Sequence, residues 1–320
     1  MTRFPPSNSL LVGAGGWAYF RVQGRESLRA YSSTFDFVEL NSTYYEYPDL
    51  RKATGWRSRV PSKFEFSVRC NKEIVQALRQ AKPTQLDETM GRMGEVCRIL
   101  DANILTVLVP KESGISEKKL ASGLEHITST FKAGNTRIAV ELRGGASKEA
   151  LRAMEENDAI HCVDISSEQP AYESGILYSR IFGKGQDNIY QFDDEEIQDI
   201  AAKASAPKFE KSILAFHGVR MFGDAARLKS FLQTGKFMQV TGQTGLDSLG
   251  EILKEDTTFP VSKPELVARQ GWKLFDLTLE RRVRAESYLS RLPAKTFDSH
   301  HDLMSSLQRW FPPDARLRIL

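Results

Sequence analysis

Short apolar runs recur along the first 220 residues of the chain, and most of them end in polar or charged residues. The runs are rich in β-branched and aromatic residues and are too short for helices, as expected of strands buried on both faces. They are Leu10–Gly15, Asp36–Asn41, Phe64–Arg69, Ile104–Val109, Arg137–Leu142, Ala159–Ile165, Ile176–Phe182 and Ser212–His217. This pattern predicts eight buried strands.

Segments of helical composition fill most of the intervals between these runs. They are Glu26–Ser33, Gln85–Leu100, Glu117–Phe131, Lys148–Glu156, Asp194–Ala204 and Asp224–Gln233. The sixth connection, Ser166–Gly175, shows no clear helical pattern. Strands that alternate with helices indicate βαβ units and a parallel sheet. Eight units favour an α/β fold of the (β/α)8 TIM-like barrel type over an open sheet.

The chain is longer than such a barrel, which takes roughly 250 residues as one domain. We therefore expect residues 1–235 to form the barrel and residues 236–320 to form a helical C-terminal extension that packs on it. Two helices are predicted in the extension, Pro264–Gln270 and Leu279–Leu292, and Ser262 is the expected N-cap of the first.

Composition narrows the classes of protein that the chain can belong to. No apolar run reaches the length of about 18 residues that a membrane span needs, and residues 1–9 lack the apolar core of a signal peptide. The three cysteines have no disulfide or zinc-site spacing, which suits a reducing cytoplasm, where we expect the protein. A net charge of +3 does not by itself indicate a nucleic-acid partner.

Charged residues stand at the carboxyl ends of the predicted strands, which meet at one mouth of a barrel. Glu39 and Asn41 alternate with apolar neighbours, so they share one side of their strand, and Glu141 and Arg143 do the same. Arg180 is expected to point inward as well. One interpretation is a purely architectural layer of salt bridges, in which the arginines balance the two glutamates.

The functional interpretation is an enzyme that binds a small anionic or phosphorylated ligand at this mouth. Glu39 or Glu141 would transfer protons, while Asn41 and His217 orient the substrate. The predicted substrate-binding residues are Gly16, Trp17, Tyr44, Arg69, Arg143, Asp164, Arg180 and Lys184. Arginine makes bidentate contacts with phosphate or carboxylate. Lys184 stands between two glycines after the seventh run, where this fold often binds phosphate.

Other functions stay open at this point. The cofactor is undecided: the set Glu39, Glu141, Asp164 and His217 could bind magnesium or manganese, as in a metal-dependent nuclease or a sugar isomerase. A non-catalytic nucleic-acid-binding protein is the third alternative. It would use the aromatic residues Trp17, Tyr19, Tyr44, Tyr45 and Tyr47 together with Arg281, Arg282, Arg284 and Arg291. Cys70, beside Arg69, is expected to be a packed thiol rather than a reactive one.

Two segments carry a resemblance to a known family. They are Gly13–Tyr19, which contains Gly-Gly-Trp, and Phe37–Tyr45, which contains Glu-Leu-Asn-Ser-Thr-Tyr-Tyr. The segments Phe64–Arg69, Glu141–Arg143 and Ser179–Gly183 continue the match. Over about residues 10–235 the chain resembles the DUF72 (YecE-like) family, and its extension resembles an archaeal-type subgroup. The resemblance implies a TIM-barrel fold and no assigned activity.

The chain departs from this family pattern at several strand ends. Arg69 replaces the usual lysine, Gly144-Gly145-Ala146 replace the usual histidine and tryptophan, and Phe182 replaces the usual histidine. His217-Gly218 stand where the family has an asparagine pair. If the family site uses those histidines, this chain has moved or lost that chemistry, and His217 is the candidate to replace one of them.

Overall fold

The structure is a computed structural model that describes residues 9–131 and 134–311. The chain forms two compact units, Met1–Phe182 with Ile200–His217, and Gly183–Asp199 with Gly218–Leu320. The predicted border at residue 235 stays a prediction. Residues 1–8, on which the expectation about a signal peptide rests, lie outside the described residues.

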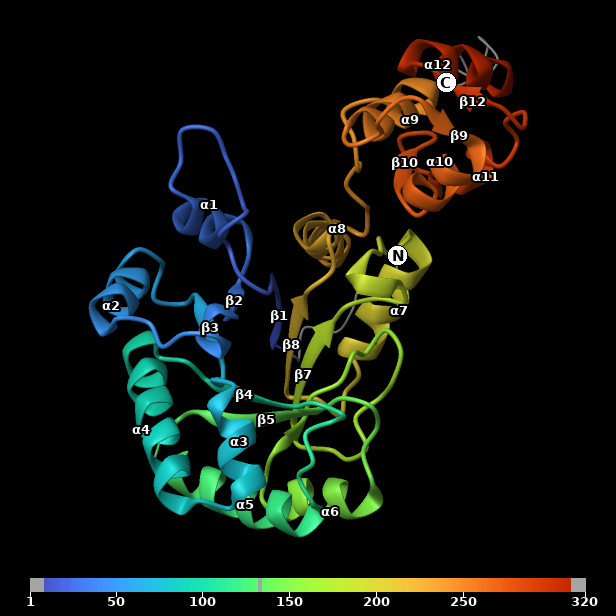
Figure 1. The fold of residues 1–320 in the computed structure, drawn as a ribbon. Coiled ribbons are helices and arrows are strands. Elements are labelled where there is room, and N and C mark those ends of the chain that lie inside the picture. Colours follow the sequence, from blue (N-terminus) through green and yellow to red (C-terminus); the bar gives the residue numbers. More distant parts are fainter. Residues whose placement is uncertain (1–8, 132–133, 312–320) are drawn as a thin grey trace. The chain divides into compact units, whose positions relative to one another are not determined.

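The first unit is built on a sheet of eight parallel strands (Figure 1), which confirms the predicted TIM-like fold. The strands neighbour one another in the order β6-β5-β4-β3-β2-β1-β8-β7. Their bounds are β1 (Ser9–Ala14), β2 (Phe37–Leu40), β3 (Glu65–Arg69), β4 (Ile104–Val109), β5 (Arg137–Leu142), β6 (Ile160–His161), β7 (Ile176–Ile181) and β8 (Lys211–Phe216).

The barrel is nearly closed between β6 and β7. An isolated parallel bridge joins Val163 to Ser179, and the backbone N–H of Arg180 donates to the carbonyl of Val163 at 3.1 Å. The strand β6 is shorter than the predicted run Ala159–Ile165, because Asp164 starts a turn by accepting a hydrogen bond from the N–H of Ser166 at 3.0 Å. As predicted, no helix follows β6 before β7 begins.

Helices follow or precede most strands, and α4, α5 and α6 lie outside β4 and β5 (Figure 1). The bounds are α1 (Ser27–Thr34), α2 (Leu50–Ser58), α3 (Glu73–Gln80), α4 (Pro83–Leu100), α5 (Glu117–Phe131), α6 (Lys148–Glu156), α7 (Asp194–Ala204) and α8 (Met221–Thr234), with the 3-10 turns η1 (Ser42–Tyr44) and η2 (Gln186–Asn188). The six predicted helices are confirmed. The helices α2 and α3 were not predicted: α2 has only one buried residue, Ala53, and α3 spans just two turns.

The interior of the barrel explains where the polar residues of the mouth point. A buried layer comprises Phe37, Ile104, Ala139, Ile160, Cys162, Tyr178, Ile213 and Ala215. Side chains two positions apart on a strand share a face. Glu39, Glu141, Arg180 and His217 each follow a member of this layer by two positions, so all four continue the inward face. The predicted inward direction of Glu39, Glu141 and Arg180 is thereby confirmed.

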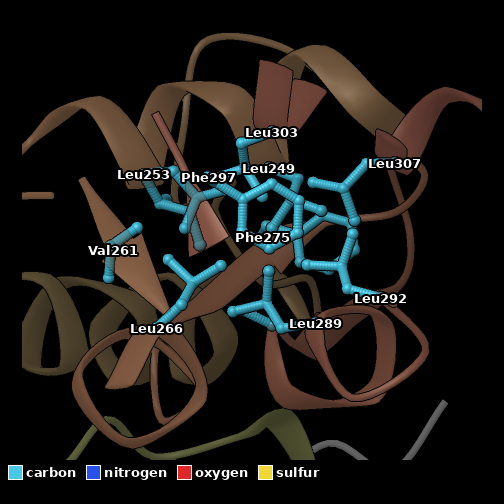
Figure 2. Close-up of a cluster of buried hydrophobic side chains, with 12 residues drawn as sticks. Leu249, Leu253, Val261, Leu266, Phe275, Leu289, Leu292, Phe297, Leu303 and Leu307 are labelled. Carbon is cyan, nitrogen blue, oxygen red and sulfur yellow. The ribbon is translucent and has the colours of Figure 1, made fainter. Parts of the chain in front are cut away.

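The second unit has a separate hydrophobic core, centred on Phe275 and drawn in Figure 2. Leucines from α9, α10 and α12 converge on it, and Val261 and Phe297 contribute from two short strands. The remaining bounds are α9 (Gly245–Lys254), β9 (Val261–Ser262), α10 (Lys263–Gln270), β10 (Leu274–Asp276), β11 (Arg282–Arg284), α11 (Glu286–Leu289), β12 (Thr296–Phe297), α12 (His300–Leu307) and the 3-10 turn η3 (Gln308–Trp310).

The predicted helix Leu279–Leu292 is wrong. Its first half forms β11, which pairs antiparallel with β10, and only α11 is helical. Two of the four arginines there are held by ion pairs: Arg282 Nε lies 2.7 Å from Asp194, and Arg284 Nη2 lies 3.2 Å from Glu196. The other predicted helix is confirmed as α10, with the Ser262 hydroxyl capping its first turn. Within the described ranges, no helix has the length and apolar character to cross a membrane.

Candidate functional site at the barrel mouth

A buried ion pair between β2 and β7 forms the centre of the candidate site. Glu39 is fully buried and Arg180 is 2% exposed. The Nε of Arg180 lies 3.1 Å from both carboxylate oxygens of Glu39, and the hydroxyl of Tyr178 donates to Oε2 at 2.6 Å. The Nη1 of Arg180 donates to Glu141 on β5. One guanidinium therefore joins the carboxylates of two strands.

Asn41 and His217 lie against this pair. The Nη2 of Arg180 donates to Asn41 Oδ1 at 3.5 Å, and Asn41 Nδ2 lies 3.4 Å from His217 Nδ1. The Nε2 of His217 lies 3.3 Å from Glu39 Oε1. Because an amide NH₂ that faces Nδ1 can only donate, the contact with Asn41 favours the imidazole tautomer with its proton on Nε2, an atom that is buried without a hydrogen-bond partner among the described residues. Asn41 Nδ2 also donates to the carbonyl of Gly15 at 3.1 Å.

The contacts of this network determine which of its side chains are charged. Burial alone would raise the pKa of Glu39, but Arg180, His217 and Tyr178 hold it well below its ordinary value. Burial raises the pKa of Glu141 as well, but the charges of Arg180 and Arg143 outweigh it, so the pKa of Glu141 is also lowered. Burial and the charge of Arg180 lower the pKa of His217. Near pH 7 the two carboxylates are therefore ionised and accept protons poorly, whereas His217 is neutral.

A pocket of about 220 Å³ opens at the ends of β5, β6 and β7. Its lining includes Glu141, Arg143, Arg180 and Phe182. Both guanidinium groups lie over the ring of Phe182, at 5.5 Å for Arg143 and 5.2 Å for Arg180. Arg143 is about half-exposed, and its Nε donates to Glu141 at 2.9 Å. The outer nitrogens of Arg143 have no hydrogen-bond partner among the described residues, and Arg143 lines a cavity far larger than the ~10–15 Å³ that holds one water.

Arg69, at the end of β3, is the buried cation that this network does not neutralise. It is 9% exposed, its guanidinium lies 3.8 Å from the ring centroid of Tyr44, and its Nε is buried without a hydrogen-bond partner. No carboxylate of residues 9–131 or 134–311 forms an ion pair with it. Burial and the nearby charge of Arg180 lower the pKa of Arg69, while the charges of Glu39 and Glu141 act in the opposite direction without outweighing them. An anion in direct contact with Arg69 would offset the remaining cost of burying this charge.

Four other predicted binding residues have structural contacts. Asp164 holds the loop after β6, because its carboxylate accepts hydrogen bonds from Ser166 and from the N–H of Phe182. Trp17 packs edge-on against Trp56 with ring centroids 5.5 Å apart. Gly16 has a φ of +110°, which explains the glycine. Lys184 belongs to the second unit, where its Nζ lies 2.9 Å from Glu196.

The side chains proposed as metal ligands do not fit a divalent ion. Arg180 donates to both Glu39 and Glu141, so a cation already stands between the two carboxylates. Asp164 is engaged by its own loop. Over the residues that the structure describes, no three His, Cys, Asp or Glu side chains gather in a way that could hold a metal. We therefore derive no chemistry from this set.

Tyr178 and Phe182 support the site although neither is among the predicted site residues. The hydroxyl of Tyr178, on the inward face two residues before Arg180, lies 2.7 Å from Ser67 Oγ and donates to Glu39. The alternation along β7 was the signal for Tyr178. No sequence pattern marks Phe182, because its contact with the guanidinium groups of two arginines depends on side-chain geometry. Cys70 is buried and burial raises its pKa, in agreement with a packed thiol.

Comparison with known proteins places the chain in a family. A model described as "Protein of unknown function DUF72" matches residues 11–244, well over half of the chain. The chain belongs to the DUF72 family. No curated protein matches this DUF72 protein in sequence.

Solved structures show the same fold. Two crystal structures of a DUF72 family protein from Enterococcus faecalis V583 are 18% and 19% identical to this DUF72 protein, with TM-scores of 0.54 and 0.56. The matches cover 71% and 70% of this chain and 97% and 94% of the other. A D-tagatose 3-epimerase-like protein is 15% identical over 70% of this chain and 96% of its own, with a TM-score of 0.46. The two Enterococcus structures support the barrel fold and say nothing of the reaction.

Proposed function

We propose that this DUF72 protein is an enzyme that binds a small anionic or phosphorylated substrate at the C-terminal mouth of its barrel. The observation that carries the proposal is Arg69, a buried guanidinium without a carboxylate partner among the described residues, next to a network in which the other charges are paired. Burying a charge is costly unless a counter-charge accompanies it. A phosphate or carboxylate supplies that counter-charge and matches the geometry of a guanidinium.

The remaining residues take distinct roles in this proposal. Arg143 lines the pocket and binds a second part of the substrate through the two outer nitrogens that Glu141 does not engage. Glu39 and Glu141, which are held ionised, fix the position of Arg180 rather than transfer protons. His217 is then the group suited to proton transfer, because it is the neutral titratable side chain of the network, with its pKa lowered by burial and by Arg180. Asn41 orients that imidazole.

The competing proposal, a nucleic-acid-binding surface made by the C-terminal arginines, has less support. Arg282 and Arg284 are engaged with Asp194 and Glu196 inside the second unit, so neither presents a free charge. We retain two further expectations as proposals. The extension after residue 235 supports an archaeal-type subgroup, and three buried free thiols support a cytoplasmic location.

Isothermal titration with inorganic phosphate tests the proposal. The wild-type protein should bind phosphate, and Arg69→Gln should lower the affinity by about tenfold or more, as expected for the loss of a charge-assisted contact. Arg69→Lys, which keeps the charge but not the fork of donors, should fall between the two. Arg98→Gln, an exposed position in the last turn of α4, is the matched control and should bind as the wild type does.

Each variant is first compared with the wild type by urea unfolding, so that loss of binding is separated from loss of fold. Phosphate binding that is absent in the wild type, or unchanged in a folded Arg69→Gln variant, would overturn the proposal.

A further inference from the structure

A second pocket adjoins the ring on which Arg69 stacks. It has a volume of about 320 Å³, and its lining includes Tyr44, Lys72, Glu73, Arg79 and Pro110. Tyr44 thus belongs both to this pocket and to the stack with Arg69. The N–H of Lys72 donates to the carbonyl of Tyr44 at 3.0 Å, which fixes the start of the lysine side chain beside the ring.

The charge of this pocket is positive. Lys72 and Arg79 are exposed, and neither forms an ion pair with a carboxylate in the described part of the chain. Glu73 is the acidic residue of the lining, and its carboxylate accepts a hydrogen bond from the hydroxyl of Tyr47 at 2.8 Å. The Nζ of Lys119 donates to the backbone carbonyl of Arg79 at 2.6 Å, so a third cation lies beside Arg79.

The two sites differ in the kind of contact that they offer. Arg69 is buried with its guanidinium over the ring of Tyr44, which suits a desolvated, directional contact with one anionic group. Lys72 and Arg79 are exposed, which suits a second group that stays in contact with water. Tyr44 contacts Arg69 and also lines the pocket, so the two kinds of cation share one aromatic neighbour.

We infer that the ligand carries two linked anionic groups, as a diphosphate does, with the inner group on Arg69 and the outer group on Lys72 and Arg79. This inference rests on the proposed function, since it takes Arg69 as the inner anion site. Linking two groups makes the second contact intramolecular, so a diphosphate gains affinity over a single phosphate without a new type of interaction. The inference names the substrate class as a diphosphate-bearing small molecule.

The test compares inorganic phosphate with pyrophosphate by isothermal titration in magnesium-free buffer. The wild-type protein should bind pyrophosphate at least about tenfold more tightly than phosphate, as expected when two linked groups engage two sites. The double variant Lys72→Ala/Arg79→Ala should bind pyrophosphate no more tightly than phosphate, while its phosphate affinity stays at the wild-type level. Lys52→Ala/Arg98→Ala removes two exposed cations from α2 and α4 and is the matched control.

The outcomes separate this inference from the proposed function. If phosphate binds through Arg69 but pyrophosphate binds no more tightly, or the double variant keeps the preference, the diphosphate inference is wrong and the anion site stands. If the control pair loses the preference to the same extent, general surface charge is responsible and the inference is again wrong. If neither anion binds the wild type, the proposed function falls and the inference falls with it.

Discussion

A Cβ atom on Gly15 would lie 2.3 Å from Nδ1 of His217, closer than any real contact allows. The same atom would lie 2.5 Å from the amide nitrogen of Asn41. Gly15 is itself fixed, because its N–H donates to the carbonyl of Phe216 at 2.9 Å and its carbonyl accepts from Asn41. The backbone after β1 therefore packs directly against the imidazole of His217 and the amide of Asn41.

The change Gly15→Ala should displace His217 and Asn41. We expect a loss of about 1–3 kcal/mol in the free energy of unfolding, the usual cost of an overpacked position. Urea unfolding measures it. Gly91→Ala, at an exposed position of α4 with no atom near the added methyl, is the control and should stabilise the protein by about 0.4–1 kcal/mol. A Gly15→Ala protein as stable as the wild type would show that Gly15 is not tightly packed against His217 and Asn41.

The inward direction of the central residues could be predicted from the sequence, but their pairing could not. A period of two along each strand places Glu39, Glu141 and Arg180 on the lumen side, whatever the register. Which carboxylate meets which guanidinium depends on strand order and barrel closure, and these bring β7 near both β2 and β5 through contacts far apart in sequence. That Arg69 is left unneutralised follows from the same long-range geometry.

The extension was harder to predict because tertiary contacts override local preference there. Leu279–Leu292 has a helical composition, yet Leu274 pairs with Arg284 in an antiparallel ladder. The pairing is supported by ion pairs to residues some ninety positions earlier, which no local pattern reveals. The helix α9 was missed for the opposite reason, since its glycines suggest a loop while Leu249 and Leu253 are buried in the core.

Removing Glu39 should be costly, because it leaves the buried guanidinium of Arg180 without its closest carboxylate. For Glu39→Gln we expect a loss of about 3–5 kcal/mol at pH 7, the range for breaking a buried ion pair. Glu156→Gln breaks a surface pair with Arg152 and should cost no more than about 1 kcal/mol. Equal effects of the two changes in urea unfolding would show that burial does not set the strength of the Glu39 pair.

The same carboxylate makes stability depend on pH on the acid side. The pKa of Glu39 is lowered in the folded protein, so the unfolded chain binds this proton more readily. Its contribution is full above the ordinary pKa of about 4.3 and is lost as pH falls toward the folded value. Between pH 5 and pH 3, urea midpoints of the wild type should therefore fall more steeply than those of Glu39→Gln. Parallel curves would show that Glu39 does not carry this dependence.

His217 should also make the protein less stable as pH falls, but in a higher pH range than Glu39 does. Burial and Arg180 lower the pKa of this imidazole, so the folded protein resists its protonation while the unfolded chain does not. Stability is full above the ordinary pKa of about 6.5 and declines as pH falls below it. The change His217→Gln should reduce the loss of stability between pH 7 and pH 5.5. Burial also lowers the pKa of His161, so His161→Gln should remove a separate share of the slope.

The three cysteines should be unreactive in the folded protein. Cys70, Cys97 and Cys162 are buried and free, and burial raises the pKa of the Cys97 thiol to about 12 and that of the other two above its ordinary value. Because the thiolate is the reactive form, a thiol reagent at pH 8 should modify none of them within minutes and all of them in urea.

Ser58→Cys, at an exposed position of α2, supplies a positive control and should react at once. Rapid modification of one native thiol, traced by peptide mapping to Cys70, would show that the positive charge of Arg69 outweighs burial at that position. In that case Cys70 would become a candidate nucleophile. If only the Ser58→Cys thiol reacts, the chemistry of the mouth is left to His217 and the charged residues around it.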